Sequence, residues 1–223
     1  MDNYTALPGI MAELEILYKV VEVDQKVFSE KYRTLYQYEV ELFKKNRDTY
    51  SFLMNGKELV GYVCCMPIAK EVYKKIKAGK LESDLTLSPN EILSYTPARI
   101  HNMYLSQIVI LPEHRNAHSK KVLMNGMFKT GIKLAKRGVI FGNLVTDAVT
   151  PEGKKMAIGF GLKPVATTTR NTTIYAGNIN TIAFREALRR IRKTRFREVL
   201  RRIRKTRFSE VFHINRKPIQ PRM

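Results

Sequence analysis

The sequence has little cysteine and little histidine. Its 223 residues include two cysteines, Cys64 and Cys65, and four scattered histidines, with no Cys-x-x-Cys pair. Neighbouring side chains on a strand point to opposite faces, so two adjacent cysteines are poorly placed to form a disulfide. We therefore expect two free thiols, buried or half-buried, and no metal site.

Long apolar runs are also missing. No run approaches the roughly 18 to 20 apolar residues that span a bilayer. The N-terminal stretch MDNYTALPGIMAELEILYKVV carries acidic residues and no basic stretch before its apolar part, unlike a signal peptide. Hydrophobic residues make up 44% of the chain, which is ordinary for a globular domain. We expect a cytoplasmic protein with one well-buried core.

Charge is plentiful but unevenly distributed. The formal net charge of the chain is +20. From Phe184 onward there are 15 basic and 3 acidic residues, a net of +12, which leaves +8 for the first 183 residues. This asymmetry predicts a body, residues 1–180, followed by a separate basic extension, residues 181–223.

Periodicity and turn signals predict the order of elements in the body. Apolar residues recur at helical spacing from Leu14 to about Phe43, with a break around Tyr32 to Thr34. Two β-rich runs flank Asn55-Gly56, which is a strong hairpin signal. The later expected elements are a helix at 69–80, a short helix opened by a capping box at Ser88–Glu91, a strand ending at Pro112, a helix at 119–138, a strand at 139–149, a helix at 151–161, and paired strands at 165–169 and 172–177.

This alternation of strands and helices predicts an α/β fold with a mixed central sheet flanked by helices. The most informative stretch runs from Gln107 to Leu123, where an apolar strand ends in Pro-Glu-His-Arg and a helix follows a short loop. A loop that leads into a helix N-terminus presents unpaired backbone N–H groups and the positive end of the helix dipole. Such a turn suits an anion, in particular a pyrophosphate.

At this stretch the chain resembles the GNAT superfamily of acyl-coenzyme A N-acyltransferases. Their signature is a strand, then Pro-x-x-Arg/Gln-x-x-Gly-x-Gly/Ala, then a helix. Pro112, Arg115 and the helix from about Ser119 match it in type and spacing, and the resemblance covers roughly residues 10 to 178. It implies a GNAT-like domain that binds acetyl-coenzyme A as co-substrate. The implied cofactor-binding residues are a strand that pairs with the pantetheine arm (Ile108, Val109, Ile110) and a pyrophosphate loop (Arg115, Asn116, Ala117, His118, Ser119, Lys120, Lys121).

The sequence departs from the signature at both small positions, which fall on His118 and Lys120. Glycine at such positions lets the backbone approach the phosphates closely. Positive charge from Arg115, Lys120 and Lys121 would offset that loss. The alternatives are a site whose cofactor binding is weakened or lost, and a turn that is only a solvated helix start.

Candidate catalytic residues are Tyr104 and Ser106. In one branch of the family a glutamate lies nine residues before the signature Arg or Gln, and here that position is Ser106. A serine cannot act as the base, but Ser106 or Tyr104, two residues apart on one strand face, would orient a water that accepts the proton. The family's acid tyrosine is replaced by Lys155 or Ala157, depending on the alignment.

The basic extension contains a twelve-residue repeat. FREALRRIRKTR begins at Phe184, FREVLRRIRKTR at Phe196, and a decayed copy at Phe208. Each unit has a helical apolar stripe, so we expect helix here. Three interpretations stay open: a tolerated duplication that forms a solvated basic helix, a contact with RNA, and an amphipathic helix for a membrane surface or a partner protein.

Two functions follow from these patterns. The first is an N-acetyltransferase that transfers acetyl from acetyl-coenzyme A to a primary amine on a small molecule or a protein. The second is a catalytically degenerate GNAT-like binding module whose basic tail contacts RNA or a partner protein.

Overall fold

The computed structural model describes residues 3–30, 33, 35–81 and 87–179, and every structural statement below concerns these residues. They belong to one compact unit, Met1–Thr181. The predicted extension and its repeats, and the domain boundary predicted near residue 180, lie outside the described residues.

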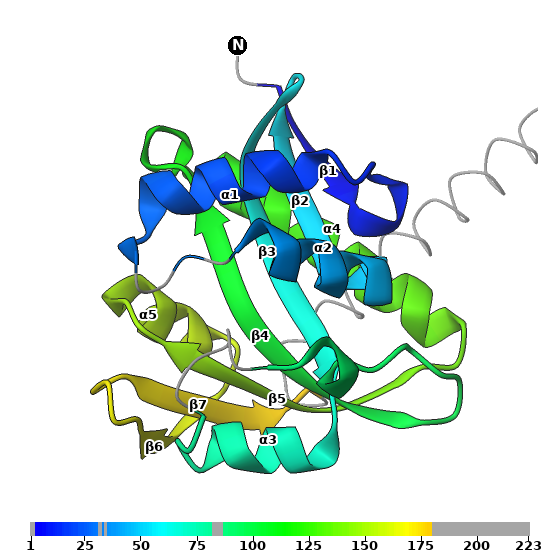
Figure 1. Cartoon of the computed structure of the whole chain (residues 1–223), viewed down its shortest axis with the longest axis vertical. Helices are drawn as coiled ribbons and strands as arrows, with labels where there is room; N and C mark the ends of the chain where they lie inside the picture. Colours follow the sequence, from blue (N-terminus) through cyan, green and yellow to red (C-terminus); the bar gives the residue numbers. More distant parts are fainter. Residues whose placement is uncertain (1–2, 31–32, 34, 82–86, 180–223) are drawn as a thin grey trace, which may run out of the picture. The chain divides into compact units, whose positions relative to one another are not determined.

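A seven-stranded sheet forms the centre of this unit, with strand order β1-β2-β3-β4-β5-β7-β6 (Figure 1). Every neighbouring pair is antiparallel except β4 and β5, which are parallel, so the sheet is mixed as predicted. The strands are β1 (Tyr4–Pro8), β2 (Tyr50–Asn55), β3 (Glu58–Ile68), β4 (Ile100–Ile110), β5 (Ile140–Ala148), β6 (Lys163–Thr167) and β7 (Thr173–Asn178).

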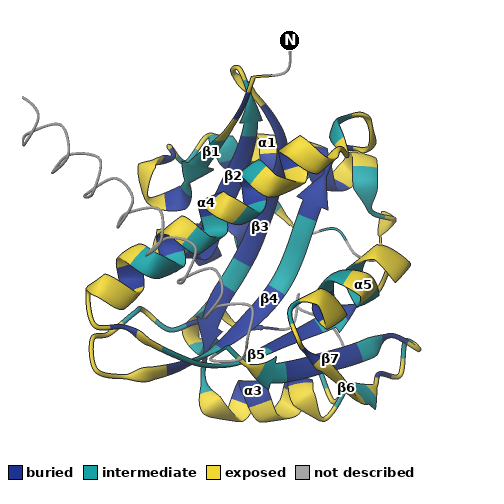
Figure 2. Ribbon diagram, turned by 180° about the vertical axis from the view of Figure 1, so that it is seen from behind, coloured by how far each residue is buried: buried dark blue, intermediate teal, exposed yellow. Residues whose placement is uncertain are grey.

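Five α-helices flank the sheet within the described residues: α1 (Ile16–Val27), α2 (Tyr36–Lys45), α3 (Lys70–Lys77), α4 (Ala117–Lys136) and α5 (Pro151–Gly159). Helices α1 and α2 cross one face of the sheet and α4 covers the other (Figures 1 and 2). Helix α3 packs on β4, β5 and β7, and α5 packs on β5 and β7. The sheet is therefore enclosed between two helical layers.

The main core lies between α1, α2 and the middle strands. Leu17 and Val20 of α1 are fully buried, because helical spacing puts them on the face turned to the sheet. Phe43 of α2 packs edge-on against Tyr50, which stacks on Phe52 with 5.7 Å between ring centroids. Exposed residues gather on the outer faces of the helices in Figure 2, as expected for amphipathic helices.

Most of the predicted elements are confirmed. The hairpin at Asn55-Gly56 joins β2 to β3, and Gly56 has a φ of 59°, which favours glycine. Gly79 and Gly138 end α3 and α4 with positive φ, and Pro151 opens α5.

The structure differs from the sequence-based expectations at two places, the short helix after Ser88 and the strand β1. The capping box at Ser88 forms as expected, but it opens only a three-residue 3₁₀ helix, Pro89–Glu91, because Ile92 bridges back to Ile68 in β3. Strand β1 was not predicted at all. It is a five-residue edge strand that ends in a proline, and edge strands tolerate a missing backbone N–H group.

Candidate functional site

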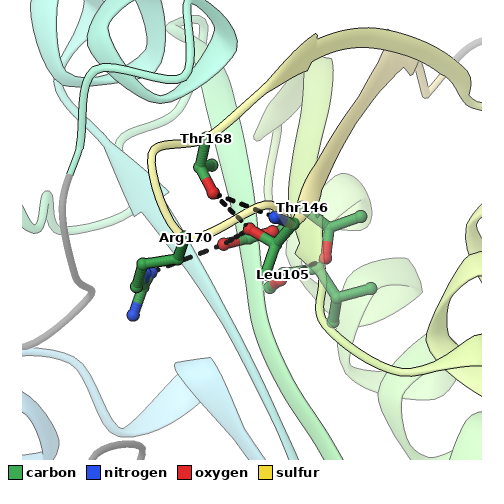
Figure 3. Close-up of polar contacts among 6 residues, drawn as sticks. Leu105, Thr146, Thr168 and Arg170 are labelled. Atoms are coloured by element: carbon green, nitrogen blue, oxygen red, sulfur yellow. Dashed lines mark hydrogen bonds and ion pairs between the residues drawn. The ribbon is translucent and has the colours of Figure 1, made fainter.

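The parallel ladder between β4 and β5 stops partway along both strands. Pairing runs from Ile100–Ile140 to Tyr104–Val145. At the next position the Thr146 hydroxyl donates to the Leu105 carbonyl at 2.8 Å (Figure 3). Beyond Leu105 no β5 residue pairs with β4 in the described part of the chain, and in Figure 1 the two arrows point apart. The second half of β4 therefore has an edge without a neighbouring strand.

The register shows which backbone groups point to this open edge. The Leu111 N–H donates to the Val60 carbonyl at 2.9 Å, toward β3. Because alternate residues of a strand direct their backbone groups to the same side, Val109 also faces β3, while Ile108 and Ile110 face the open edge. Of the three residues predicted to bind an extended ligand, two present backbone groups where such a ligand could pair as an added strand.

A β-bulge interrupts β4 at the start of the open edge. Gln107 lies opposite Cys64 and Leu105 opposite Cys65, which leaves Ser106 as the extra residue. The bulge shifts the alternation of side chains along β4, so that Tyr104 and Gln107 point to the same face of the sheet. Their cross-strand partners in β3 are Met66 and Cys64. We expected Tyr104 and Ser106 to share that face from their spacing alone. Tyr104 is buried and Ser106 half-buried, and their catalytic role stays a prediction.

The turn after β4 holds the predicted anion-binding residues. Arg115 is exposed, and its Nε donates to the Ile110 carbonyl at 2.8 Å. That bond occupies the last acceptor on the open edge and keeps the guanidinium beside it. Arg115 therefore places a fixed positive charge where the edge of β4 meets the turn.

A capping box opens α4. The Asn116 side-chain oxygen accepts from the Ser119 N–H at 2.9 Å, and the Ser119 hydroxyl oxygen accepts from the Asn116 N–H at 3.2 Å. The fully buried Ser119 also donates to the His114 carbonyl at 2.5 Å. The chain thus satisfies with its own side chains some of the amides that the sequence predicted for a ligand.

Two amides in this turn are left over. The N–H groups of Ala117 and His118 make no hydrogen bond within the described residues. They lie at the positive end of a 20-residue helix, and the exposed Lys120 and Lys121 follow them. The turn therefore offers two free amides and two cations to an anion.

Strand β1 supports this turn from the side. The Tyr4 hydroxyl lies 3.0 Å from His114 Nδ1 and 3.3 Å from the side-chain nitrogen of Asn116. The Tyr4 ring also contacts His118, with 5.8 Å between centroids. Sequence reasoning missed Tyr4 because it missed the strand that carries it.

A buried polar network lies on the α1 side of β4. Tyr62 donates toward Asp24 Oδ1 at 2.5 Å and lies 2.7 Å from the Gln107 side-chain oxygen. Tyr50 donates to Glu39. Burial, and then the neighbouring carboxylate and thiol groups, raise the pKa of both tyrosines well above its usual value. The sequence contained a signal for one member of the network, because Asp24 falls on the apolar stripe of α1.

The turn between β6 and β7 is tied to the end of β5. Asp147 accepts from the Thr172 hydroxyl at 2.9 Å and pairs with Arg170 at 3.5 Å. Thr168 and Thr172 share a further hydrogen bond of 2.6 Å. Figure 3 shows Thr168 and Arg170 around this turn, close to the Thr146–Leu105 contact. Polar side chains thus border the point where β4 and β5 part.

Helix α5 carries the two positions that replace the family's acid tyrosine. Lys155 is exposed and Ala157 is buried in the smaller core cluster under α5. Both cysteines are free thiols, as predicted, and burial raises the pKa of Cys65 to about 12. The described residues contain no group of three potential metal ligands and no helix long and apolar enough to cross a membrane.

Comparisons with known proteins identify the fold. No protein-family model matches the sequence, and neither does any curated protein. Solved structures do match. The loading GNATL domain of CurA from Lyngbya majuscula aligns with a TM-score of 0.59 at 14% identity, over 80% of this chain and 98% of that domain.

Two further structures agree with this match. Ard1 from Thermoplasma volcanium aligns with a TM-score of 0.53 at 8% identity, over 80% of this chain and 99% of its own. Naa50 from Arabidopsis thaliana, in complex with a bisubstrate analogue, aligns with a TM-score of 0.50 at 10% identity, over 78% and 97%. The chain has the fold of the GNAT superfamily of acyl-coenzyme A N-acyltransferases.

Proposed function

We propose that the chain is an N-acetyltransferase that transfers the acetyl group of acetyl-coenzyme A to a primary amine. The observation that carries this proposal is the open edge of β4, where Ile108 and Ile110 present backbone groups without a neighbouring strand. The pantetheine arm contains two amides in an extended chain, and such a chain pairs with a free strand edge. The Naa50 structure of the same fold holds a ligand described as CoA-Ac-MVNAL, which joins coenzyme A to a peptide.

The turn that follows β4 supplies a site for the pyrophosphate. The free amides of Ala117 and His118 would bind phosphate oxygens, and Arg115, Lys120 and Lys121 would balance their charge. Positive charge replaces part of the close backbone approach that His118 and Lys120 prevent. The turn would therefore bind the pyrophosphate with fewer backbone amides and more cationic side chains than the family signature provides.

Chemistry would occur where β4 and β5 part. The neutral amine attacks the thioester carbonyl, the C–S bond breaks, and the departing thiolate takes up a proton while the amine loses one. Tyr104 is the last β4 residue paired with β5, and Ser106 follows it at the start of the open edge, where the two would orient a water that accepts the amine's proton. Holding the amine beside the thioester supplies much of the rate enhancement in such a reaction.

Calorimetry with acetyl-coenzyme A tests the cofactor site. The double variant Lys120→Glu, Lys121→Glu should bind at least roughly tenfold more weakly than the natural chain, because it reverses two charges beside the pyrophosphate. Lys129→Glu, Lys133→Glu is the matched control, since both lysines are exposed on the same helix, starting about 13 Å further along its axis. Equal loss in both variants, or no binding by the natural chain, would refute the cofactor site.

Release of free thiol in the presence of amines tests the transfer itself. The panel should contain a polyamine, free amino acids, lysine-containing peptides and peptides with a free N-terminus. Turnover that requires both acetyl-coenzyme A and one of these amines supports the enzyme and identifies the acceptor class. Tight binding of acetyl-coenzyme A with no turnover on any class contradicts it.

That last outcome would favour the alternative, a GNAT-like binding module. Specific observations support it: Asn116 occupies the Ser119 amide, and no tyrosine stands at either aligned position of the acid. In this alternative the basic extension contacts RNA or a partner protein, and the sheet serves as a scaffold.

A further inference from the structure

Asp24 is a fully buried acidic residue on the apolar side of α1. It is buried on the same helix as Leu17, Val20 and Val23. Burial of a carboxyl group is costly unless hydrogen bonds compensate for lost water. Here the Tyr62 hydroxyl, also fully buried, lies 2.5 Å from Asp24 Oδ1. The contact links α1 to the centre of β3.

The same hydroxyl lies 2.7 Å from the side-chain oxygen of Gln107. A tyrosine hydroxyl holds one proton and can donate it to only one of these two oxygens. The pKa of Tyr62 is raised well above its usual value by burial and then by Asp24, so the hydroxyl keeps this proton. The second contact therefore needs a proton from elsewhere.

Two arrangements satisfy this proton count. If Asp24 is protonated, it donates to Tyr62, which donates to the Gln107 oxygen, and the Gln107 NH₂ group points away. If Asp24 is ionised, Tyr62 donates to it. The Gln107 amide must then turn over, so that its NH₂ group donates to Tyr62 and its oxygen points away. The charge of Asp24 thus decides which end of the amide Gln107 presents.

Gln107 lies where this difference matters. Leu105 is the last residue of β4 in contact with β5, and Gln107 follows it by two positions. Gln107 lies on the same sheet face as Tyr104, the face covered by α1. It is half-buried, and its amide nitrogen makes no hydrogen bond within the described residues. The outer end of the Gln107 amide is therefore without a hydrogen-bond partner within the described residues, on a residue that follows the last β4–β5 contact by two positions.

We propose that Asp24, Tyr62 and Gln107 form a proton-coupled chain that positions the acceptor amine. This inference rests on the transferase function proposed above. With Asp24 ionised, Gln107 presents its side-chain oxygen beside the open edge and accepts an N–H from the amine. With Asp24 protonated, Gln107 presents an NH₂ group, which repels a donor. Gln107 is the residue that contacts the amine, and Asp24 and Tyr62 are positioning residues.

Other ionisable groups lie near Asp24, Tyr62 and Gln107 on the sheet face that α1 covers. Glu39 and Cys64 both raise the pKa of Tyr62, after the larger effects of burial and Asp24. The groups on the elements packed here are Tyr62 and Cys64 of β3, Tyr104 of β4, Glu39 of α2, and Tyr50 of β2, which is bonded to Glu39. A second carboxyl–tyrosine pair, Glu39 with Tyr50, thus lies close by, and no hydrogen bond in the described residues joins either of them to Gln107.

Nuclear magnetic resonance of the labelled full-length protein tests the coupling between Asp24, Tyr62 and Gln107 without any ligand. The Gln107 side-chain amide signals are assigned by their loss in Gln107→Met, and the Asp24 carboxyl carbon is followed across the pH range of the folded protein. We expect the amide signals to move with the same midpoint as the Asp24 carbon. The movement should disappear in Tyr62→Phe. Amide signals that do not follow Asp24, or an Asp24 that does not titrate, would overturn the proposal.

Steady-state kinetics adds a functional measurement, with the panel amine that the natural chain acetylates fastest. Tyr62→Phe should raise KM for this amine about tenfold and leave KM for acetyl-coenzyme A unchanged. The reason is that only the contact of Gln107 with the amine depends on the hydrogen bonds of Tyr62. Tyr50→Phe is the matched control, since it also removes a buried tyrosine–carboxylate bond, and it should change neither KM. Equal effects of the two variants on the amine KM would show a structural role and contradict the proposal. If the natural chain acetylates no amine, the proposed function fails, and the resonance measurement still decides on the proton-coupled chain.

Discussion

At the scale of single residues, three tyrosines are distinguished by strongly raised pKa values, and two of them, Tyr50 and Tyr62, have almost no exposed surface. Tyr50, Tyr62 and Tyr95 have pKa values well above the usual one, chiefly because burial disfavours the phenolate. Each of them ionises more easily in the unfolded chain. Their contribution to the stability of the fold is therefore complete below about pH 10 and is lost as the pH rises above it.

The expected result is cooperative alkaline unfolding. In a spectrophotometric titration near 295 nm, Tyr50, Tyr62 and Tyr95 should ionise only together with loss of the fold, because burial raises their pKa values well above the usual one. Circular dichroism on the same samples detects the unfolding. Complete ionisation of all tyrosines while the circular dichroism stays native would contradict the burial of this group.

Some single-residue features could be predicted from the sequence and others could not. Pro112 and Arg115 stand at fixed spacing between a strand and a helix, and their positions follow from local rules. The contact between Tyr62 and Asp24 joins residues 38 positions apart, so it depends on the packing of α1 on the sheet. Asp24 is nevertheless an acid on the apolar stripe of α1, a mismatch in the sequence from which a buried partner could have been predicted.

At the scale of elements, the start of α4 combines a capping function with a proposed binding function. Asn116→Ala should lower the free energy of unfolding by about 1 kcal/mol, because α4 loses its N-cap. The same change frees the Ser119 amide for a phosphate, so affinity for acetyl-coenzyme A should rise. Urea unfolding and calorimetry measure the two effects.

Thr150→Ala is the control for that variant. The Thr150 hydroxyl caps α5 by accepting from the Gly153 N–H at 3.0 Å, so its loss should cost a similar free energy. It lies outside the turn that begins α4 and should leave acetyl-coenzyme A affinity unchanged. If both variants change the affinity for acetyl-coenzyme A in the same way, the effect comes from lost stability and the free Ser119 amide does not contribute to binding.

Two glycines within α4 provide a test of how this helix packs. A Cβ on Gly126 would lie 2.7 Å from the Ala6 Cβ of β1, whereas a Cβ on Gly131 would meet nothing within 4 Å. Gly131→Ala should stabilise the chain by roughly 0.5 to 1 kcal/mol, since alanine favours helix. Gly126→Ala should destabilise it by roughly 1 to 3 kcal/mol through overpacking. Denaturant unfolding distinguishes them, and equal signs would contradict the packing of α4 on β1.

The elements also show where sequence patterns stop being informative. Strong local signals, such as Asn55-Gly56 and Pro151, mark turns and helix starts that the structure confirms. The bulge at Ser106 leaves no local signal, because it depends on how β4 pairs with β3. The loss of pairing beyond Tyr104 likewise depends on the direction of β5, so the open edge was expected only from the family resemblance.

At the scale of the whole molecule, charge separates the described unit from the rest of the chain. Residues 1–183 carry a net charge of +8, and those from Phe184 onward carry +12. Dense arginine binds nucleic acid through phosphate contacts whose strength falls steeply with salt. A tolerated duplication and an amphipathic helix for membranes or partners remain the competing interpretations of the repeat.

Binding of the full chain and of a chain ending at Thr181 to single-stranded RNA distinguishes these interpretations. If the repeats contact RNA, affinity of the full chain should fall at least roughly tenfold between 50 and 200 mM salt, and the shortened chain should bind more weakly with a smaller salt dependence. Both chains should bind acetyl-coenzyme A equally, because the proposed cofactor residues lie before residue 122. Equal RNA affinity of the two chains would refute the RNA contact. Retention of only the full chain by anionic vesicles, without RNA binding, would favour the membrane-surface helix.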